Sequence, residues 1–293
     1  MIVVVGGSGR LGRPLVARLL DAGRRVRVVA RRPDRAADFA GPDVEVVQGD
    51  VTRPDTLTGA LDGASVVVSA MHGLGAPERS VSPDRVDRLG NRALIDAAAA
   101  SDADVVLVSV IGAAAEGNDL FAAKWAAEEY LRGSGVRWTV VRSAAFAEMW
   151  LDVLHDTAGR SGRPRVLGTG TNPINFVAVA DVAAAVARAC LDPGLRGRVI
   201  EVGGPADLTL EALARSLCRP GATPRHVPRA ALRVLGELAR PVHPGFARLA
   251  RMGLSMDTEN LRFDPAPSLA AYPWLTCSPV TLGDGGVPRA TST

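Results

Sequence analysis

Lysine is nearly absent from this chain of 293 residues: of its 34 lysine and arginine residues, only Lys124 is lysine. Aromatic residues make up 4% of the sequence. No apolar run approaches the ~18 residues of a membrane-spanning segment. The N-terminal apolar run follows no basic segment and precedes no cleavage pattern, which argues against a signal peptide. We therefore expect a cytoplasmic protein without a membrane partner, whose net charge of +3 comes from arginine.

Cysteine and histidine are also scarce, with three and four residues. Cys190, Cys218 and Cys277 lie far apart, and their odd number and spacing fit neither a disulfide framework nor a metal site. The histidines show no ligand pairing. The sequence therefore predicts no metal ion, and the cysteines are interpreted as small buried apolar residues.

Glycine, by contrast, is concentrated near the N-terminus. The apolar residues Ile2–Val5 run directly into Gly6-Gly7-Ser8-Gly9-Arg10-Leu11-Gly12, and an apolar helical pattern follows. A buried parallel strand, a glycine turn and a helix open a dinucleotide-binding fold, in which the glycines allow a tight turn, close approach of the pyrophosphate and close helix packing. The N–H groups at the helix start then meet the phosphates. We predict that residues 6–12 bind a dinucleotide, in preference to an ordinary glycine-rich turn.

Apolar runs and helical patterns alternate through the first half of the chain. Strands are predicted at residues 25–30, 44–47, 65–69, 104–109 and 136–142, and helices at residues 55–61, 82–100 and 119–132. This alternation is typical of an α/β fold with a doubly wound parallel sheet of the Rossmann type.

The alternation loosens after residue 142. Helices are predicted at residues 144–155, 181–190 and 209–218, strands at 174–179 and 199–202, and a loop at 159–173. We place the Rossmann core in residues 1–155, with residues 174–205 returning to it. Residues 206–293 are predicted to form a smaller substrate-binding lobe, with a frayed tail beyond Gly283.

The second predicted strand ends in Arg31-Arg32, where an NAD-binding fold carries an acidic residue for the ribose 2′-hydroxyl. Two arginines suit a 2′-phosphate instead, so the sequence favours NADPH/NADP+. Arg13 is a further candidate for the same phosphate. A nucleic-acid patch is the alternative use of these arginines, but they stand where the cofactor predicts them, so we expect no nucleic-acid partner.

Two further strand ends are assigned to the cofactor. Asp50 and Val51 follow the third strand, near the expected adenine, although a helix cap explains Asp50 equally well. Ser69, Ala70 and Met71 end the fourth strand, at the crevice where open α/β sheets bind ligands.

Candidate pocket residues lie in the next loop and on the helix predicted at residues 144–155. His72 either lines the substrate site or is an ordinary loop histidine. Phe146, Met149 and Trp150 share one helix face and could cap an aromatic substrate, although core packing is the commoner use of such a stripe.

These features together resemble the NmrA-like branch of the atypical short-chain dehydrogenase/reductases, with similarity to isoflavone reductase-like enzymes. The resemblance spans residues 1–215 and includes, besides the glycine run and Arg31-Arg32, the segments Gly49-Asp50-Val51, Phe121-Ala-Ala-Lys124, residues 134–146 and 176–183, and Gly203-Gly204-Pro205. It implies an NADPH-binding core, with the substrate held between core and C-terminal lobe. It implies no single activity, because some members reduce C=C or C=O bonds and others sense redox state. It also assigns Asp181 a structural, helix-capping role.

The chain departs from the Tyr-x-x-x-Lys pair usual in that superfamily, because Leu120 stands four residues before Lys124. Neither Tyr130 nor Tyr272 has a lysine four residues on, and the usual catalytic serine would fall near Ile111. What remains is similar to the isoflavone reductase-like arrangement, in which the lysine of Phe-x-x-Lys acts alone. The resemblance thus implies that Lys124 is catalytic and contacts the cofactor.

An ammonium group suits hydride transfer because it stabilises the negative charge left on the substrate or donates a proton. The alternative for Lys124 is a surface lysine paired with Glu128 one turn further on. The chain otherwise uses arginine for surface charge, which favours the functional interpretation.

The leading hypothesis is an NADPH-dependent reductase of a small organic substrate, aromatic or a secondary metabolite. The missing tyrosine and serine keep open a non-catalytic NADP(H)-binding redox sensor that acts through a partner protein. A sugar-nucleotide epimerase or dehydratase normally needs the tyrosine–lysine pair and is disfavoured. The oligomeric state stays open, a homodimer included.

Overall fold

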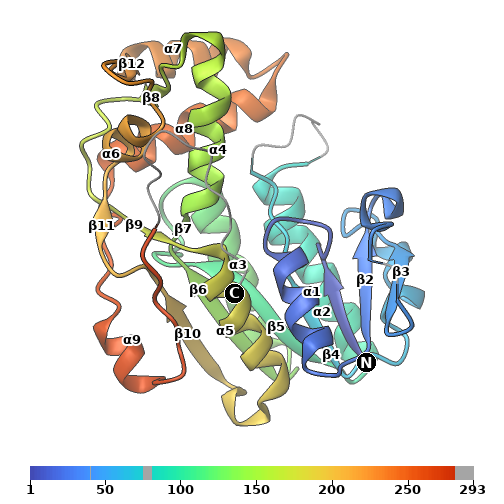
Figure 1. Ribbon diagram of the computed structural model, residues 1–293. Coiled ribbons are helices and arrows are strands. Elements are labelled where there is room, and N and C mark those ends of the chain that lie inside the picture. Colours follow the sequence, from blue (N-terminus) through green and yellow to red (C-terminus); the bar gives the residue numbers. More distant parts are fainter. Residues whose placement is uncertain (40, 75–80, 281–293) are drawn as a thin grey trace. The chain divides into compact units, whose positions relative to one another are not determined.

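The computed structural model describes residues 1–39, 41–74 and 81–280, which divide into two compact units (Figure 1). The first unit consists of Met1–Ser143, Val179–Val202 and Ser268–Thr276. The second consists of Ala144–Ala178, Gly203–Pro267 and the described residues from Cys277 onward. This division differs from the predicted boundary at residue 155, because the segment after Ser143 packs with the second unit. The predicted frayed tail beyond Gly283 lies outside the described residues.

The first unit is built on a parallel sheet whose seven strands run in the order β3-β2-β1-β4-β5-β6-β10. Their bounds are β1 Ile2–Val5, β2 Val26–Ala30, β3 Val44–Gln48, β4 Val66–Ser69, β5 Asp104–Val110, β6 Trp138–Ser143 and β10 Arg198–Val202. Valine-rich strands such as Ile2–Val5 are buried throughout, as expected when helices cover both faces of a parallel sheet. The predicted Rossmann fold is confirmed, with strand ends within two residues of the prediction.

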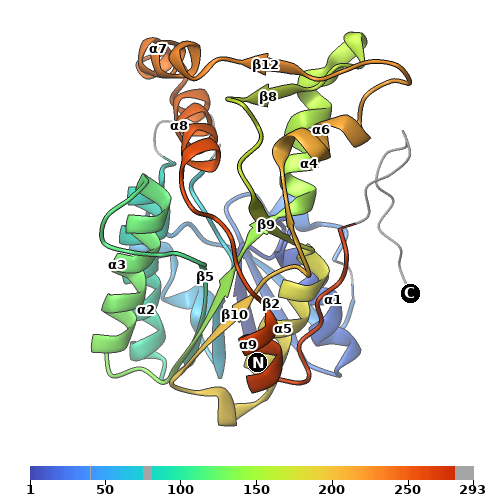
Figure 2. The ribbon, with the colours of Figure 1, turned by 90° about the vertical axis from the view of Figure 1, so that its left-hand side faces the viewer.

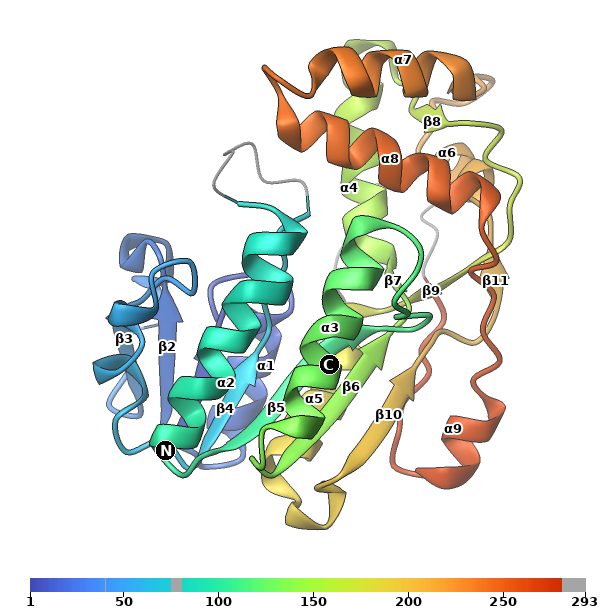
Figure 3. The ribbon, with the colours of Figure 1, turned by 180° about the vertical axis from the view of Figure 1, so that it is seen from behind.

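Helices cover both faces of this sheet. Figures 2 and 3 show α2 (Asn91–Ala100) and α3 (Asp119–Gly133) on one side, and α1 (Gly12–Asp21) and α5 (Val179–Leu191) on the other. The segment before α2, Pro83–Gly90, is a π-helix, so the helix predicted at residues 82–100 changes its winding midway. The helix predicted at residues 55–61 is wrong, because this stretch forms only two short 3₁₀ turns.

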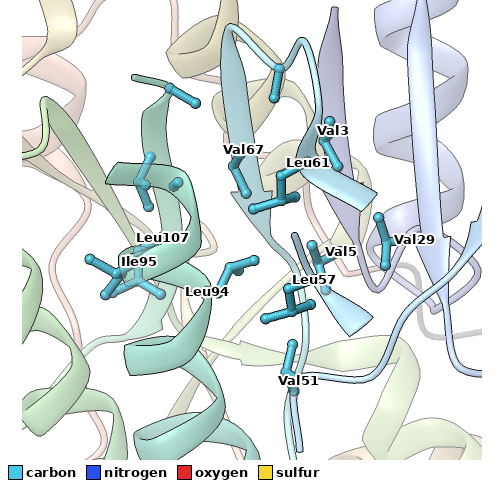
Figure 4. Close-up of a cluster of buried hydrophobic side chains, with 14 of the residues drawn as sticks. Val3, Val5, Val29, Val51, Leu57, Leu61, Val67, Leu94, Ile95 and Leu107 are labelled. Atoms are coloured by element: carbon cyan, nitrogen blue, oxygen red, sulfur yellow. The ribbon is translucent and has the colours of Figure 1, made fainter. Parts of the chain in front are cut away.

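A hydrophobic core lies on the α2 side of the sheet (Figure 4). Val3, Val5 and Val67 contribute from the strands, and Leu94 and Ile95 pack against them from α2. Burying a side chain of this size contributes about 1.5–3 kcal/mol, so this cluster fixes the strand ends that carry the candidate site.

The second unit combines short strands with helices. Its elements are β7 Ala145–Phe146, α4 Ala147–Ala158, β8 Arg165–Leu167, β9 Ile174–Val177, β11 Asp207–Leu208, α6 Leu210–Ser216, β12 Arg225–Val227, α7 Arg229–Ala239 and α8 Pro244–Thr258. β9 pairs with β7 and β11, and β8 pairs with β12. Thr209 caps α6 as predicted, since its side chain accepts from the N–H of Ala212. The short helix α9 (Ala266–Ala271) spans the boundary between the units.

A buried carboxylate organises the second unit. Asp257 of α8 accepts from the backbone N–H groups of Thr169 and Gly170 and from the side chain of Arg229. Desolvation raises the pKa of Asp257, but these hydrogen bonds outweigh it and lower the pKa below its usual value. The loop after β8 is thereby tied to α7 and α8.

None of the helices within the described ranges combines the length and the apolar character that crossing a bilayer requires.

Candidate functional site

The glycines of the turn between β1 and α1 differ in backbone angle and in the space around them. Gly6 has a φ of +89°, and a Cβ there would lie 2.6 Å from the carbonyl oxygen of Ala70. A Cβ on Gly12 would lie 2.2 Å from the carbonyl oxygen of Gly6, so only glycine lets α1 start this close to β1. A Cβ on Gly9 would meet only that same oxygen, at 3.1 Å, and Gly9 is exposed. The turn is therefore tight at Gly6 and Gly12 and accessible at Gly9.

This turn lies at the switch point of the sheet, because chain order reverses between β1 and β4. Val5 pairs with Ser69, and the N–H of Ala70 donates to the carbonyl of Val5 at 2.9 Å. The loops that follow β1 and β4 thus leave the sheet side by side. Open α/β sheets bind dinucleotides in the crevice at this position.

Arg31 and Arg32 follow β2 directly, and both side chains are exposed. Among the described residues neither guanidinium has a hydrogen-bond or ion-pair partner, which leaves both charges available. Arg13 is engaged instead: it donates to the carbonyls of Ser8 and Arg35 and pairs with Asp38. These contacts of Arg13 argue against the prediction that it reaches the phosphate. The guanidinium groups without a described partner, those of Arg31 and Arg32, lie at the strand end where the sequence predicted the phosphate site.

Asp50 stabilises the turn after β3. Its Oδ1 accepts from the backbone N–H and the hydroxyl of Thr52, at 2.9 and 2.7 Å. The carboxylate therefore caps a turn at residue 52 rather than a helix at residues 55–61. Val51 is buried in the core, so only its backbone is open to a cofactor.

A buried polar network lies behind the end of β4. The hydroxyl of Ser69 donates to Asn91, and the amide of Asn91 donates to the carbonyl of Asp87. The carboxylate of Asp87 accepts from the N–H of Gly73 at 2.7 Å and lies 3.0 Å from the ammonium of Lys124. Ser69, Asp87 and Asn91 are fully buried. The side chain of Ser69 is thus committed to the protein interior, and a cofactor would meet the backbone of this loop.

Lys124 is held by two hydrogen bonds and one ion pair. Its Nζ donates to the carbonyl of Met71 at 3.0 Å and to that of Val108 at 2.9 Å, and it lies 3.0 Å from Oδ1 of Asp87, an oxygen that accepts no hydrogen bond from the described residues. Its side chain is 4% exposed. The alternative of a surface lysine paired with Glu128 is wrong. Lys124 instead joins α3 to the π-helix and to the carboxyl ends of β4 and β5.

The sequence analysis missed Asp87 and Asn91. One signal was present: at helical spacing the apolar positions Val86, Gly90 and Leu94 place both polar residues on the buried face. A buried polar group needs a partner inside the protein, and the partner here is the only lysine of the chain. The π-helix itself is a feature that often accompanies functional sites.

Glu128 belongs to a second buried cluster. It accepts from the hydroxyl of Ser109 and from the guanidinium groups of Arg132 and Arg142. Desolvation raises the pKa of Glu128, but the hydrogen bonds from Arg142, Ser109 and Arg132 outweigh it and lower the pKa. Ser109 therefore serves this cluster, and its hydroxyl is occupied.

His72 is exposed in the loop after β4. Desolvation by the surrounding protein lowers the pKa of His72, the charge of Asp87 raises it, and the charges of Lys124 and Arg10 lower it again. The net effect is a pKa below the usual value.

The predicted aromatic pocket residues belong to the second unit. Trp150 is buried at 2% exposure, which favours core packing for this residue. Phe146 and Met149 are half-buried. Phe146 lies in β7, not on the predicted helix, because α4 begins only at Ala147.

The remaining titratable groups form no metal centre in the part of the chain that the structure describes. Burial raises the pKa of Cys190 to about 12, which makes this thiol unreactive. Cys218 and Cys277 are half-buried, so the prediction of burial holds only for Cys190.

The sheet order, the glycine turn at the switch point and the arginine pair define a Rossmann-type dinucleotide-binding protein. More particularly, the chain belongs to the NAD(P)H-binding family, which it matches over residues 6–193. The family-level resemblance seen in the sequence is thereby confirmed.

The proteins that are similar to this chain include two relatives and one solved structure. The (4-alkanoyl-5-oxo-2,5-dihydrofuran-3-yl)methyl phosphate reductase of Streptomyces griseus is 33% identical over 226 residues, which cover 75% of each chain. A photosystem II assembly factor of Cyanophora paradoxa is 31% identical over 147 residues, or 50% of this chain and 45% of the relative. The NADPH-dependent quinone oxidoreductase of Escherichia coli, solved with NADPH, has the same fold at a TM-score of 0.75 and 23% identity, covering 97% and 98% of the chains.

Proposed function

We propose that this protein is an NADPH-dependent reductase that transfers hydride to a carbonyl or an activated alkene of a small organic substrate. The observation that carries the cofactor choice is the exposed pair Arg31 and Arg32, whose charges have no partner among the described residues. A 2′-phosphate supplies the charge-assisted acceptors that such a pair binds best.

The proposed substrate class is taken from the Streptomyces griseus relative. The substrate in that relative's name is an oxo-dihydrofuran that carries an alkanoyl group. A ring alkene conjugated to carbonyl groups accepts hydride at carbon and leaves the negative charge on oxygen. We assign His72 to contact that substrate, since it is exposed in the loop that follows β4. Phe146 and Met149 remain predicted candidates for contact with the apolar part of a substrate.

Lys124 is proposed to act as a fixed positive charge and a positioning residue. Its ammonium holds the carbonyl of Met71 while Asp87 holds the N–H of Gly73. The backbone between these two bonds runs from Met71, which is assigned to the cofactor, to Gly73, and it carries His72, which is assigned to the substrate. Because two donors of Lys124 hold backbone carbonyls and its charge is paired with Asp87, we assign the proton that completes the reduction to solvent or the substrate site.

The test is NADPH oxidation with a panel of unsaturated lactones, quinones and aromatic ketones, with the product identified by mass as the dihydro compound. We expect Asp87→Asn and Lys124→Met to lower kcat by about a hundredfold, because a displacement of about 1 Å in the loop has that effect. The KM for NADPH should change much less. Full activity of both variants would refute the positioning role, and lack of turnover across the panel would refute the reductase.

The non-catalytic sensor is the second candidate. It is favoured by the burial and ion pairing of Lys124 and by the absence of a tyrosine at position 120. The assembly-factor relative supports a protein-binding role for this fold. In that case NADPH binds without turnover, and the oxidised and reduced cofactors differ in their effect on partner binding.

A further inference from the structure

Exposed apolar side chains are concentrated in one short stretch of the second unit. Among the described residues six large hydrophobic side chains are exposed, and five of them lie between residues 234 and 246. They are Val234 at 58%, Leu235 at 46%, Leu238 at 70%, Val242 at 68% and Phe246 at 45%. We call these five residues the hairpin strip, since they belong to α7, to the turn after it and to the start of α8. Clusters of this kind mark an interaction surface.

The three strip residues of α7 are separate from the face of this helix that packs against α8. Leu232 and Gly236 of α7 are buried, and a Cβ on Gly236 would lie 3.5 Å from the side chain of Ala250 in α8. Val234 and Leu238 project from the opposite side of the helix, and Leu235 lies between them and the buried face. Figures 1 and 2 show α7 lying over α8 at the end of the second unit remote from β9. The helix therefore has one apolar face toward its own unit and another toward solvent.

The stretch of chain that contains the strip is strongly basic. Residues 212–256 contain one acidic residue, Glu237, and eight arginines: Arg215, Arg219, Arg225, Arg229, Arg233, Arg240, Arg248 and Arg251. All except Arg248 are exposed.

Three of the exposed arginines are neutralised within the unit: Arg215 by Glu211, Arg229 by Asp257 and, at 3.9 Å, Arg240 by Glu237. The side chains of Arg219, Arg225 and Arg233 form no ion pair with any described residue. An apolar face in a stretch of chain that also carries unpaired arginines matches an anionic lipid surface, where the apolar side chains enter the interface and the guanidinium groups meet the headgroups.

We propose that the α7–α8 hairpin binds the surface of a membrane that contains anionic lipids. A second copy of the chain fits the apolar strip but not its charge, because pairing the same face would bring the unpaired arginines of both copies together. The expectation from sequence of no membrane partner rested on the absence of a spanning segment, which does not bear on binding at the surface.

The experiment is co-sedimentation of the full chain with phosphatidylcholine vesicles, with and without phosphatidylglycerol. We expect binding only to the anionic vesicles. Leu235→Glu with Leu238→Glu should lower the partition coefficient by about a hundredfold. Arg225→Gln with Arg233→Gln should lower it about fivefold for each charge removed. Leu89→Glu, at an exposed large hydrophobic residue outside the strip, is the matched control and should bind like the parent.

Equal binding to both vesicle compositions, or no binding to either, would overturn the proposal. So would an unchanged partition coefficient in the leucine double variant. Light scattering on the same samples tests the other occupant: a dimer that Leu235→Glu with Leu238→Glu dissociates, without vesicle binding, would assign the strip to a second copy. Circular dichroism confirms that each variant is folded, and the arginine variant leaves the strip itself unaltered.

Discussion

Replacing Lys124 by methionine should be among the most destabilising single changes in the chain. The variant leaves the Asp87 carboxylate fully buried and without its counter-charge, 3.0 Å from where the ammonium was. Removing one partner of a buried ion pair typically costs about 3–5 kcal/mol. Since whole domains are stable by about 5–15 kcal/mol, this loss is a large fraction of the total.

The partner substitution is Asp87→Asn, which removes the charge but keeps an oxygen that accepts from the N–H of Gly73. Alone it leaves Lys124 as the uncompensated charge, so a similar loss is expected. Combining Lys124→Met with Asp87→Asn removes both charges together. The double variant should therefore lose less than the two single losses added, with a coupling energy of about 2–3 kcal/mol.

Urea unfolding of the four proteins without cofactor, followed by circular dichroism, measures this cycle. Arg88→Gln is the control, because it breaks an exposed ion pair with Asp84 on the same π-helix and should cost under about 1 kcal/mol. A loss below about 1 kcal/mol in Lys124→Met, or strict additivity in the double variant, would show that the buried pair does not support the loop after β4.

Two further predictions concern the glycine turn and acid stability. Gly12→Ala places a Cβ 2.2 Å from a backbone oxygen and should lose about 1–3 kcal/mol of stability together with NADPH affinity. Gly9→Ala should keep its stability in a thermal melt and lose affinity alone, whereas Gly133→Ala, with open space around its Cβ, should change neither; equal affinity losses at Gly9 and Gly133 would refute the turn assignment. Because the folded-state pKa of Glu128 is lowered, its ionisation stabilises the fold above about pH 4.3, the usual value, and this contribution is lost as the pH falls through the lower folded-state pKa. Urea midpoints across the acid range should fall more steeply in the parent than in Glu128→Gln, and parallel curves would contradict that.

The sheet was predictable because each of its strands is a short valine-rich run beside a glycine or polar boundary. Val44–Gln48 and Arg198–Val202 were recognised in this way even at the sheet edges. The 3₁₀ turns at residues 54–61 were not, because Leu57 and Leu61 are buried at a spacing that a regular helix would also give. Local pattern does not distinguish these windings.

The sequence predicted those parts of the candidate site that depend on backbone geometry, such as the glycine turn. It did not predict the side-chain contacts within the site. Glycine spacing reports a backbone geometry directly, and Arg31-Arg32 follow a strand whose end is visible in the sequence. The partners of Lys124 are distant in the chain: Met71 and Asp87 come from other elements. Only the fold shows that the ammonium is buried and ion-paired, which changes its proposed role from proton donor to positioning charge.

The most direct test of the account is a fluorescence titration of the purified protein with NADPH and with NADH, repeated with Arg31→Ala combined with Arg32→Ala. Hydrogen bonds to a charged group contribute about 1.5–3 kcal/mol, so the parent should bind NADPH about tenfold to a hundredfold more tightly than NADH. In the double variant that preference should disappear through weaker NADPH binding, while NADH binding stays the same. Equal affinities in the parent, or equal losses for both cofactors in the variant, would contradict the assignment of the site to NADP(H).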